Sequence, residues 1–132
     1  MDKYIWVVDD DESIRWVLEK GLQDSGMDVQ TFDSANKVIK KLETENPKLI
    51  LTDIRMPGPS GIDLLDKVKE LRPDIPVIIM TAHSDLDSAV ESYEHGAWEY
   101  LPKPFDIEEA ISMVQRATAL DESNDDKEIE SQ

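Results

Sequence analysis

The sequence contains no cysteine, which excludes a disulfide scaffold, a thiol nucleophile and a cysteine-ligated zinc site. It also lacks any apolar run close to the roughly 20 residues of a membrane-spanning helix, and its first residues lack the apolar stretch of a signal peptide. Basic residues are few, with 14 Lys and Arg against 30 Asp and Glu, giving a net charge of −16. Such a surface repels nucleic-acid phosphates and anionic membranes. We therefore expect a cytoplasmic protein that binds neither directly.

The length of 132 residues fits one compact domain. The last twelve residues differ from the rest, because residues 121–132 contain six acidic residues and one aliphatic residue. Such a segment cannot bury enough apolar area to order itself. We expect one domain over residues 1–120, followed by an acidic linker or disordered tail over residues 121–132.

Short apolar runs alternate five times with segments of helical periodicity. The runs predict strands buried on both faces, and the segments predict helices with one apolar stripe. Strict alternation favours an α/β fold with an open, doubly wound parallel sheet, because five units are too few for an eight-stranded barrel. The expected strands are residues 4–8, 29–32, 49–51, 77–80 and 98–101.

Several local signals refine this pattern. Gly26 and Gly96 stand where the first and fourth helices are expected to end. Ser84 is predicted to cap the start of the fourth helix. Trp6 and Trp16 are expected to pack in the core or at its edge rather than to form a binding platform.

Polar residues follow the apolar runs at four of the five predicted strands. In parallel sheets these positions converge on one edge, where ligands bind. Crowded carboxylates need a cation, and Mg²⁺ prefers such oxygen ligands. A hydroxyl and an ammonium group can bind phosphate oxygens, and one carboxylate can act as a nucleophile on phosphorus. The residues are Asp9, Asp10, Asp11, Asp53, Thr81 and Lys103. Taken alone, Asp11 is equally explained as a favourable charge at a helix N-terminus.

Four short motifs stand in order at the predicted strand ends: Val7-Val8-Asp9-Asp10, Asp53-Ile54-Arg55-Met56-Pro57-Gly58, Met80-Thr81-Ala82 and Lys103-Pro104-Phe105. Together they resemble the receiver domain of bacterial response regulators, and the resemblance covers about residues 3–120. Further stretches around Ser13, Val77 and Tyr100 are similar to the sigma-54-dependent transcriptional activators, in particular those of nitrogen regulation. The resemblance implies a flavodoxin-like (βα)5 fold with strand order 2-1-3-4-5.

The resemblance assigns a role to each matching position. Asp53 matches the phosphoacceptor, which takes a phosphoryl group from a sensor histidine kinase. Asp10 matches a direct Mg²⁺ ligand, Asp9 a ligand that acts through water, and the backbone carbonyl of Arg55 a further ligand. The remaining matches are Thr81, the switch hydroxyl; Lys103, the phosphoryl contact that precedes a peptide bond usually cis in the family; and Tyr100, the aromatic residue whose burial follows the movement of Thr81.

The resemblance also implies partners outside this chain. It predicts a following ATPase domain and a DNA-binding domain, control of sigma-54-dependent transcription, and pairing with a second receiver after phosphorylation. The protein is then a signalling switch that assists its own phosphorylation and slow dephosphorylation, not a metabolic enzyme. One stretch departs from the family pattern, because Pro59 and Ser60 stand where many relatives have Met and Asp.

Two other functions compete with this interpretation. An aspartyl-phosphate phosphatase normally needs an acid two residues after its nucleophile, and here that position is Arg55. A flavin carrier on a similar sheet needs a phosphate loop rich in Ser, Thr and Gly after the first strand, where this chain has three aspartates.

Overall fold

The computed structural model describes residues 4–130 as five strands that alternate with five helices. This confirms the predicted alternation. The elements are β1 (Tyr4–Val8), α1 (Glu12–Asp24), β2 (Asp28–Phe32), α2 (Ala35–Lys41), β3 (Leu49–Asp53), α3 (Gly61–Leu71), β4 (Val77–Ala82), α4 (Leu86–Glu94), β5 (Glu99–Lys103) and α5 (Ile107–Glu130).

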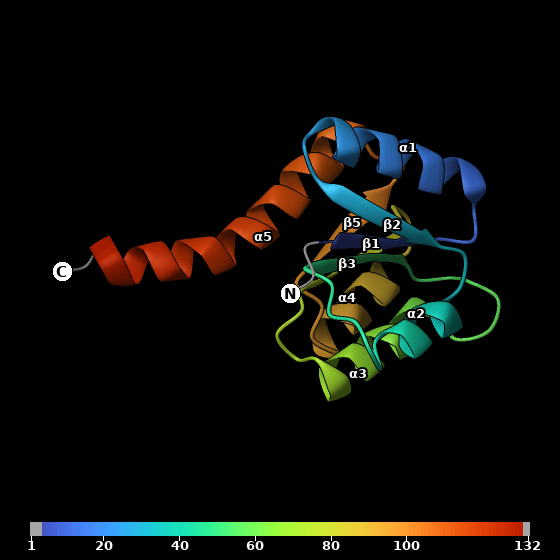
Figure 1. Ribbon diagram of the computed structural model, residues 1–132. Coiled ribbons are helices and arrows are strands. Elements are labelled where there is room, and N and C mark those ends of the chain that lie inside the picture. Colours follow the sequence, from blue (N-terminus) through green and yellow to red (C-terminus); the bar gives the residue numbers. More distant parts are fainter. Residues whose placement is uncertain (1–3, 131–132) are drawn as a thin grey trace.

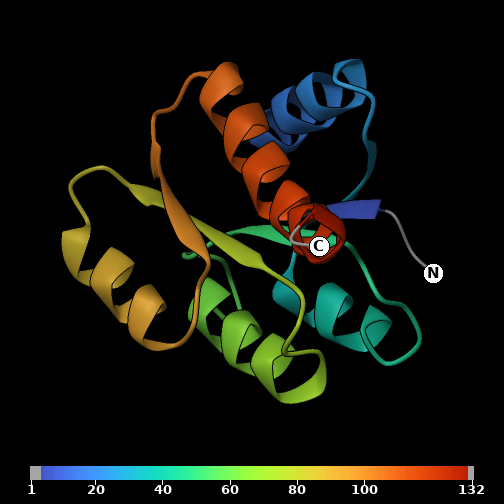
Figure 2. The ribbon, with the colours of Figure 1, turned by 90° about the vertical axis from the view of Figure 1, so that its left-hand side faces the viewer.

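The strands form one parallel sheet in the order β2-β1-β3-β4-β5, which confirms the expected fold and strand order. Helices α1 and α5 lie on one face of the sheet, and α2, α3 and α4 lie on the other (Figures 1 and 2). The chain therefore forms three layers, with the middle strands covered on both faces. This explains why β3 is buried along its whole length.

Each face of the sheet has its own hydrophobic core, because successive side chains of a strand point to opposite faces. In β1, Ile5 and Val7 pack toward α1 and α5, whereas Trp6 and Val8 pack toward α2 and α3. Trp6 is fully buried, as expected. The expectation for Trp16 is wrong, because it lies on the outer side of α1 with 61% of its surface exposed.

Three strands are longer at their carboxyl ends than the apolar runs predicted. β3 includes Asp53, β4 includes Thr81 and β5 includes Lys103. In the sheet, Asp53 is aligned with Met80, and Thr81 with Pro102. The candidate site residues are therefore held by the sheet itself rather than by the loops that follow it.

The helix boundaries agree with the local signals except at one position. Gly26 and Gly96 follow the ends of α1 and α4 with φ of 89° and 100°, a conformation that favours glycine. The prediction for Ser84 is wrong, because Asp85 caps α4 by accepting a hydrogen bond from the backbone N–H of Ser88 at 3.3 Å.

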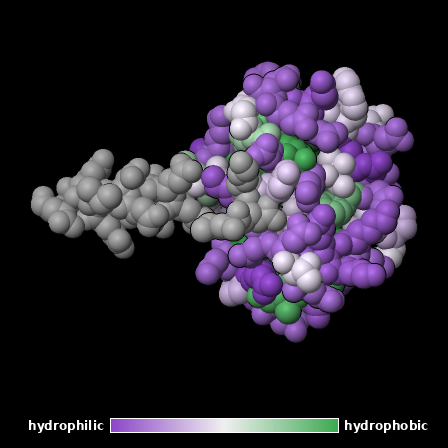
Figure 3. All heavy atoms as spheres, viewed as in Figure 1, coloured by the Kyte–Doolittle hydropathy of each residue, from purple (hydrophilic) through white to green (hydrophobic). Residues whose placement is uncertain are grey.

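Helix α5 continues to Glu130 and projects beyond the body of the domain (Figure 1). The expected boundary at residue 120 and the linker role of residues 121–132 stay predictions, and the last two of these residues lie outside the described part. In residues 4–130, none of the helices combines the length and the apolar character needed to cross a membrane. The face shown in Figure 3 is mostly hydrophilic, with small hydrophobic patches.

Candidate functional site

Three carboxylates meet at the carboxyl edge of the sheet. Asp9 and Asp10 follow β1, and Asp53 ends the neighbouring strand β3. One oxygen of each carboxylate lies within 4.8 Å of one oxygen of the other two, close enough to share a small cation. Hard oxygen ligands of this kind suit Mg²⁺, which usually keeps several waters in its coordination sphere. The convergence predicted from the sequence is therefore observed for these three residues.

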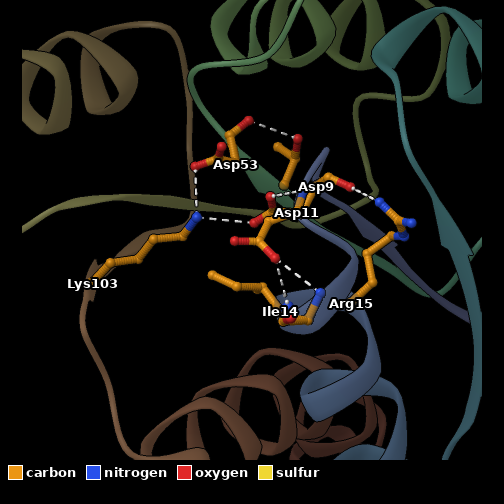
Figure 4. A network of polar contacts seen from close by, with 8 residues as sticks. Asp9, Asp11, Ile14, Arg15, Asp53 and Lys103 are labelled. Atoms are coloured by element: carbon orange, nitrogen blue, oxygen red, sulfur yellow. Dashed lines mark hydrogen bonds and ion pairs between the residues drawn. The ribbon is translucent and has the colours of Figure 1, made fainter.

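Lys103 reaches into this cluster from β5. Its Nζ lies 2.9 Å from Oδ2 of Asp9 and 3.1 Å from Oδ1 of Asp53, so that one ammonium group bridges two carboxylates (Figure 4). The Lys103–Pro104 peptide bond is cis, as the resemblance implied. The expected contact between Lys103 and a group bound at Asp53 stays a prediction.

The two sides of this bridge have shifted pKa values. Burial raises the pKa of Asp53, the neighbouring charge of Asp9 raises it further, and Lys103 opposes both effects. Burial alone lowers the pKa of Lys103, but its hydrogen bond to Asp9 and the charges of Asp53 and Asp9 outweigh that effect and raise it. The Asp53 carboxylate is therefore less stable as an anion than an exposed one, and a cation at the site would relieve this.

Thr81 carries a buried hydroxyl that has no partner within residues 4–130. The residue is 1% exposed, and its Oγ1 has no hydrogen-bond partner in the described part of the chain. Burying a hydroxyl without a hydrogen bond costs free energy, so such groups are rare. Thr81 is aligned in the sheet one residue beyond the pair formed by Asp53 and Met80. An acceptor bound at Asp53 could therefore satisfy this hydroxyl.

Asp11 is separated from the other aspartates by its role as a cap. Its Oδ1 accepts hydrogen bonds from the backbone N–H groups of Ser13 and Ile14, at 2.8 and 3.3 Å (Figure 4). This is the helix N-terminal role that the sequence left as an alternative. Asp10 is exposed, and its side chain makes no hydrogen bond within the described residues. Asp10 therefore keeps its oxygens free for a ligand.

The loop after β3 depends on residues that sequence reasoning did not select. Gly61 begins α3 against the site, because a Cβ at this position would lie 2.4 Å from the backbone oxygen of Asp53. Ser60 and Asp63 form a reciprocal capping box, with hydrogen bonds of 2.9 and 3.1 Å. The unusual Ser60 therefore caps α3. The sequence signal was available, since Ser60 stands three residues before an acidic side chain.

The side chain of Arg55 pairs with an acidic residue outside the cluster of three carboxylates. Its Nη2 lies 2.7 Å from Oδ2 of Asp85, the cap of α4. The position where a phosphatase would place its acid thus holds a guanidinium group that joins the loop after β3 to the start of α4.

Tyr100 lies outside the carboxylate cluster, and its expected role in the switch stays a prediction. It is half-buried, and its ring packs edge-on against Tyr93 of α4 with the ring centroids 5.8 Å apart. The Tyr93 hydroxyl donates a hydrogen bond to the carboxylate of Glu99. Tyr100 therefore connects β5 to α4.

This fold and this site define a class of signalling domain. The sequence matches the family model of the response regulator receiver domain over residues 5–115, and the chain belongs to this family.

The relatives give a narrower resemblance. The chain is 57% identical over 112 residues to the DNA-binding transcriptional regulator NtrC of Klebsiella pneumoniae, and 55% identical over 113 residues to NtrC of Escherichia coli K12. These matches cover 85% and 86% of this chain but only 24% of each relative, so the chain spans about a quarter of their length.

Solved structures of receiver domains are also similar to this chain. The solution structure of the apo receiver domain of nitrogen regulatory protein C matches with a TM-score of 0.80 and 53% identity, over 90% of this chain and 97% of that chain. A CheY-like receiver domain protein from Methanospirillum hungatei matches with a TM-score of 0.87 and 30% identity, over 94% and 99%. The predicted resemblance to the receiver domain of a nitrogen regulatory protein, NtrC, is thereby confirmed.

Proposed function

We propose that this receiver domain is a phosphorylation-operated switch in which Asp53 accepts a phosphoryl group from a sensor histidine kinase. The observation that carries the proposal is the set of groups around Asp53: two further carboxylates, a bridging ammonium group from Lys103 and the unpartnered hydroxyl of Thr81. Together they provide ligands for a cation and donors for the oxygens of a phosphoryl group.

Mg²⁺ would be held by Asp10 and Asp53 directly, by Asp9 through water and by the backbone carbonyl of Arg55. The ion would supply positive charge that screens the anionic donor from the anionic acceptor. Asp9 is less free than Asp10, because its two carboxylate oxygens already accept hydrogen bonds from the Asp11 N–H and from Lys103, each at 2.9 Å. This difference supports the assignment of Asp10 as the direct ligand.

The transfer itself requires only a positioned nucleophile. A carboxylate oxygen of Asp53 forms a bond to phosphorus while the bond from phosphorus to the kinase imidazole nitrogen breaks, and the nitrogen keeps the electron pair. Lys103 then exchanges part of its contact with the carboxylates for a phosphoryl oxygen, and Thr81 donates its hydroxyl to another. Both contacts exist only in the modified state, so they favour a different conformation of the domain.

The expected consequence is a shift of α4 and β5. Movement of Thr81 toward Asp53 vacates space that the ring of Tyr100 can fill, and Tyr100 contacts Tyr93 of α4. Helix α4 exposes apolar residues in the unphosphorylated chain, because Leu86 is 62% and Val90 51% exposed. A face of this kind can pair with a second receiver or with an output domain.

The relatives are DNA-binding regulators of which this chain covers about a quarter, so the output is expected to lie in further domains. We expect an ATPase domain and a DNA-binding domain to follow the receiver and to control sigma-54-dependent transcription in nitrogen regulation. The segment 121–132 would then serve as the link between the receiver and these domains.

Intact mass spectrometry tests the proposal. After incubation with acetyl phosphate and Mg²⁺, the chain should gain one phosphoryl group, and this gain should disappear in Asp53→Asn or in excess chelator. Asp66→Asn, which removes an acid from α3 away from the cluster, is the matched control and should be modified like the unaltered chain. Full modification of Asp53→Asn would overturn the proposal.

A further inference from the structure

Arg15 of α1 reaches back toward the carboxyl end of β1. Its Nη1 donates a hydrogen bond of 2.7 Å to the backbone carbonyl oxygen of Asp9 (Figure 4). The side chain is half-buried, and its own backbone N–H donates to the carbonyl of Asp11 at 3.1 Å. Arg15 thus lies one helical turn after Asp11, and its side chain folds back toward Asp9.

The hydrogen bond from Arg15 means that every polar group of Asp9 has a hydrogen-bond partner. The backbone N–H donates to the carbonyl of Phe32 at 3.1 Å, Oδ1 accepts from the Asp11 N–H at 2.9 Å, and Oδ2 accepts from Lys103 at 2.9 Å. The backbone carbonyl is the remaining polar group, and Arg15 is its partner among the described residues. Every polar group of this buried aspartate is therefore held in place.

The carbonyl of Asp9 matters because it shares a rigid peptide plane with the N–H of Asp10. Asp10 is exposed, and within the described chain no hydrogen bond holds its side chain. Its direction therefore depends on the orientation of that peptide plane. We infer that Arg15 is a positioning residue of the metal site, which acts by fixing the Asp9–Asp10 peptide so that the Asp10 carboxylate faces Asp53. This inference rests on the proposed function of the site.

The direction in which Mg²⁺ affinity changes when Arg15 is removed tests the inference, because Arg15 carries a positive charge. Lys103 takes carboxylate oxygens, whereas Arg15 takes a backbone oxygen and leaves the carboxylates free for a cation. If Arg15 contributed only its charge, its removal would make the site more negative and would strengthen Mg²⁺ binding. If it orients Asp10, its removal must weaken Mg²⁺ binding despite that gain.

The experiment compares Mg²⁺ binding in the unphosphorylated chain, followed by the backbone amide shifts of Asp10 and Asp11. Arg15→Met should weaken the affinity roughly 10-fold, the usual size of an effect for a residue that orients a metal ligand. Lys20→Met is the matched control, because it removes one exposed positive charge from the same helix without touching Asp9. It should leave the affinity unchanged or slightly higher. With acetyl phosphate, the Arg15 variant should need more Mg²⁺ for half-maximal rate and recover most of its rate at saturation.

Equal or tighter Mg²⁺ binding by Arg15→Met would overturn the inference while leaving the proposed function intact. If Arg15→Met does not fold, Arg15→Gln decides in the same way, because the shorter neutral side chain cannot span the distance to the Asp9 carbonyl. If the unaltered chain binds no Mg²⁺ and gains no phosphoryl group, the proposed function itself fails.

Discussion

Helices α3 and α4 cover the same face of the sheet but are attached to it in different ways. α3 buries Leu64, Leu65 and Val68, whereas the buried residues of α4 are Ala89 and Ser92. Ser92 satisfies its hydroxyl within the helix, by donating to the carbonyl of Ala89 at 2.7 Å. α3 is therefore held by apolar area, and α4 contributes little of it.

Polar contacts at its two ends attach α4 instead. At its start, the cap Asp85 accepts from Arg55 at 2.7 Å, and at its end the ring of His95 lies 2.6 Å from the carboxylate of Asp66 in α3. Exposed ion pairs contribute little to stability. A displacement of α4 would therefore disturb less buried apolar area than a displacement of α3.

The largest effect on the free energy of unfolding is expected from a substitution that weakens the packing of α3 against the sheet. Leu65→Ala should lower the free energy of unfolding by about 2–5 kcal/mol, because it leaves a cavity under α3. Val90→Ala in α4 should change it by less than about 0.5 kcal/mol, because Val90 is 51% exposed. Urea unfolding measures both. Similar losses in the two variants would contradict the difference between the helices.

A smaller effect on the free energy of unfolding is expected at Asp53, the last residue of β3. The raised pKa of Asp53 means that the folded state holds its proton more tightly than the unfolded state, so stability falls as pH rises through that pKa. Asp53→Asn removes this charge and should raise the free energy of unfolding at pH 7 by on the order of 1 kcal/mol.

The gain should vanish near pH 3, where Asp53 is protonated in both states. Saturating Mg²⁺ should reduce it at pH 7, because the ion binds the folded unaltered chain. Thermal unfolding across pH, with and without Mg²⁺, measures this. A variant that is less stable than the unaltered chain at pH 7 would show that the Asp53 charge is stabilising there.

The smallest effect on stability is expected from the pair of His95 and Asp66 at the end of α4. The hydrogen bond with Asp66 raises the pKa of His95, and the charges of Asp66, Glu91 and Glu94 add to it, although desolvation opposes them. A raised pKa stabilises the fold below the ordinary value of about 6.5, and this contribution is lost as pH rises through the raised pKa. In Asp66→Asn the pKa of His95, followed by its ring proton resonances, should fall. An unchanged titration would show that the pair does not form in solution.

The sequence was sufficient to predict the alternation of elements and the convergence of Asp9, Asp10, Asp53 and Lys103. The reason is topological, since residues at the carboxyl ends of parallel strands meet at one edge whatever their side chains do. The same logic placed Thr81 at this edge, directly after the predicted fourth strand. It could not show that the Thr81 hydroxyl has no hydrogen-bond partner among the described residues, because that depends on every atom around it.

Contacts that depend on how loops and helix ends meet were not predictable. The pairing of Arg55 with Asp85 joins residues 30 positions apart, and the reach of Arg15 depends on how α1 leaves the sheet. Ser84 and Asp85 are both good capping residues, so the choice between them needed the backbone. The exposure of Trp16 escaped the pattern because a single aromatic residue beside apolar helix positions resembles a core residue.

We expect a group bound at Asp53 to move α4 through Thr81 while α3 stays in place. The most direct test adds the phosphoryl mimic beryllium fluoride with Mg²⁺ and follows backbone amide shifts in the unaltered chain and in Thr81→Val. Large changes are expected over residues 85–100 and small changes within α3, and Thr81→Val should suppress the changes in α4. Changes confined to the loops around Asp10, Asp53 and Lys103, with residues 85–100 unaffected, would contradict this expectation.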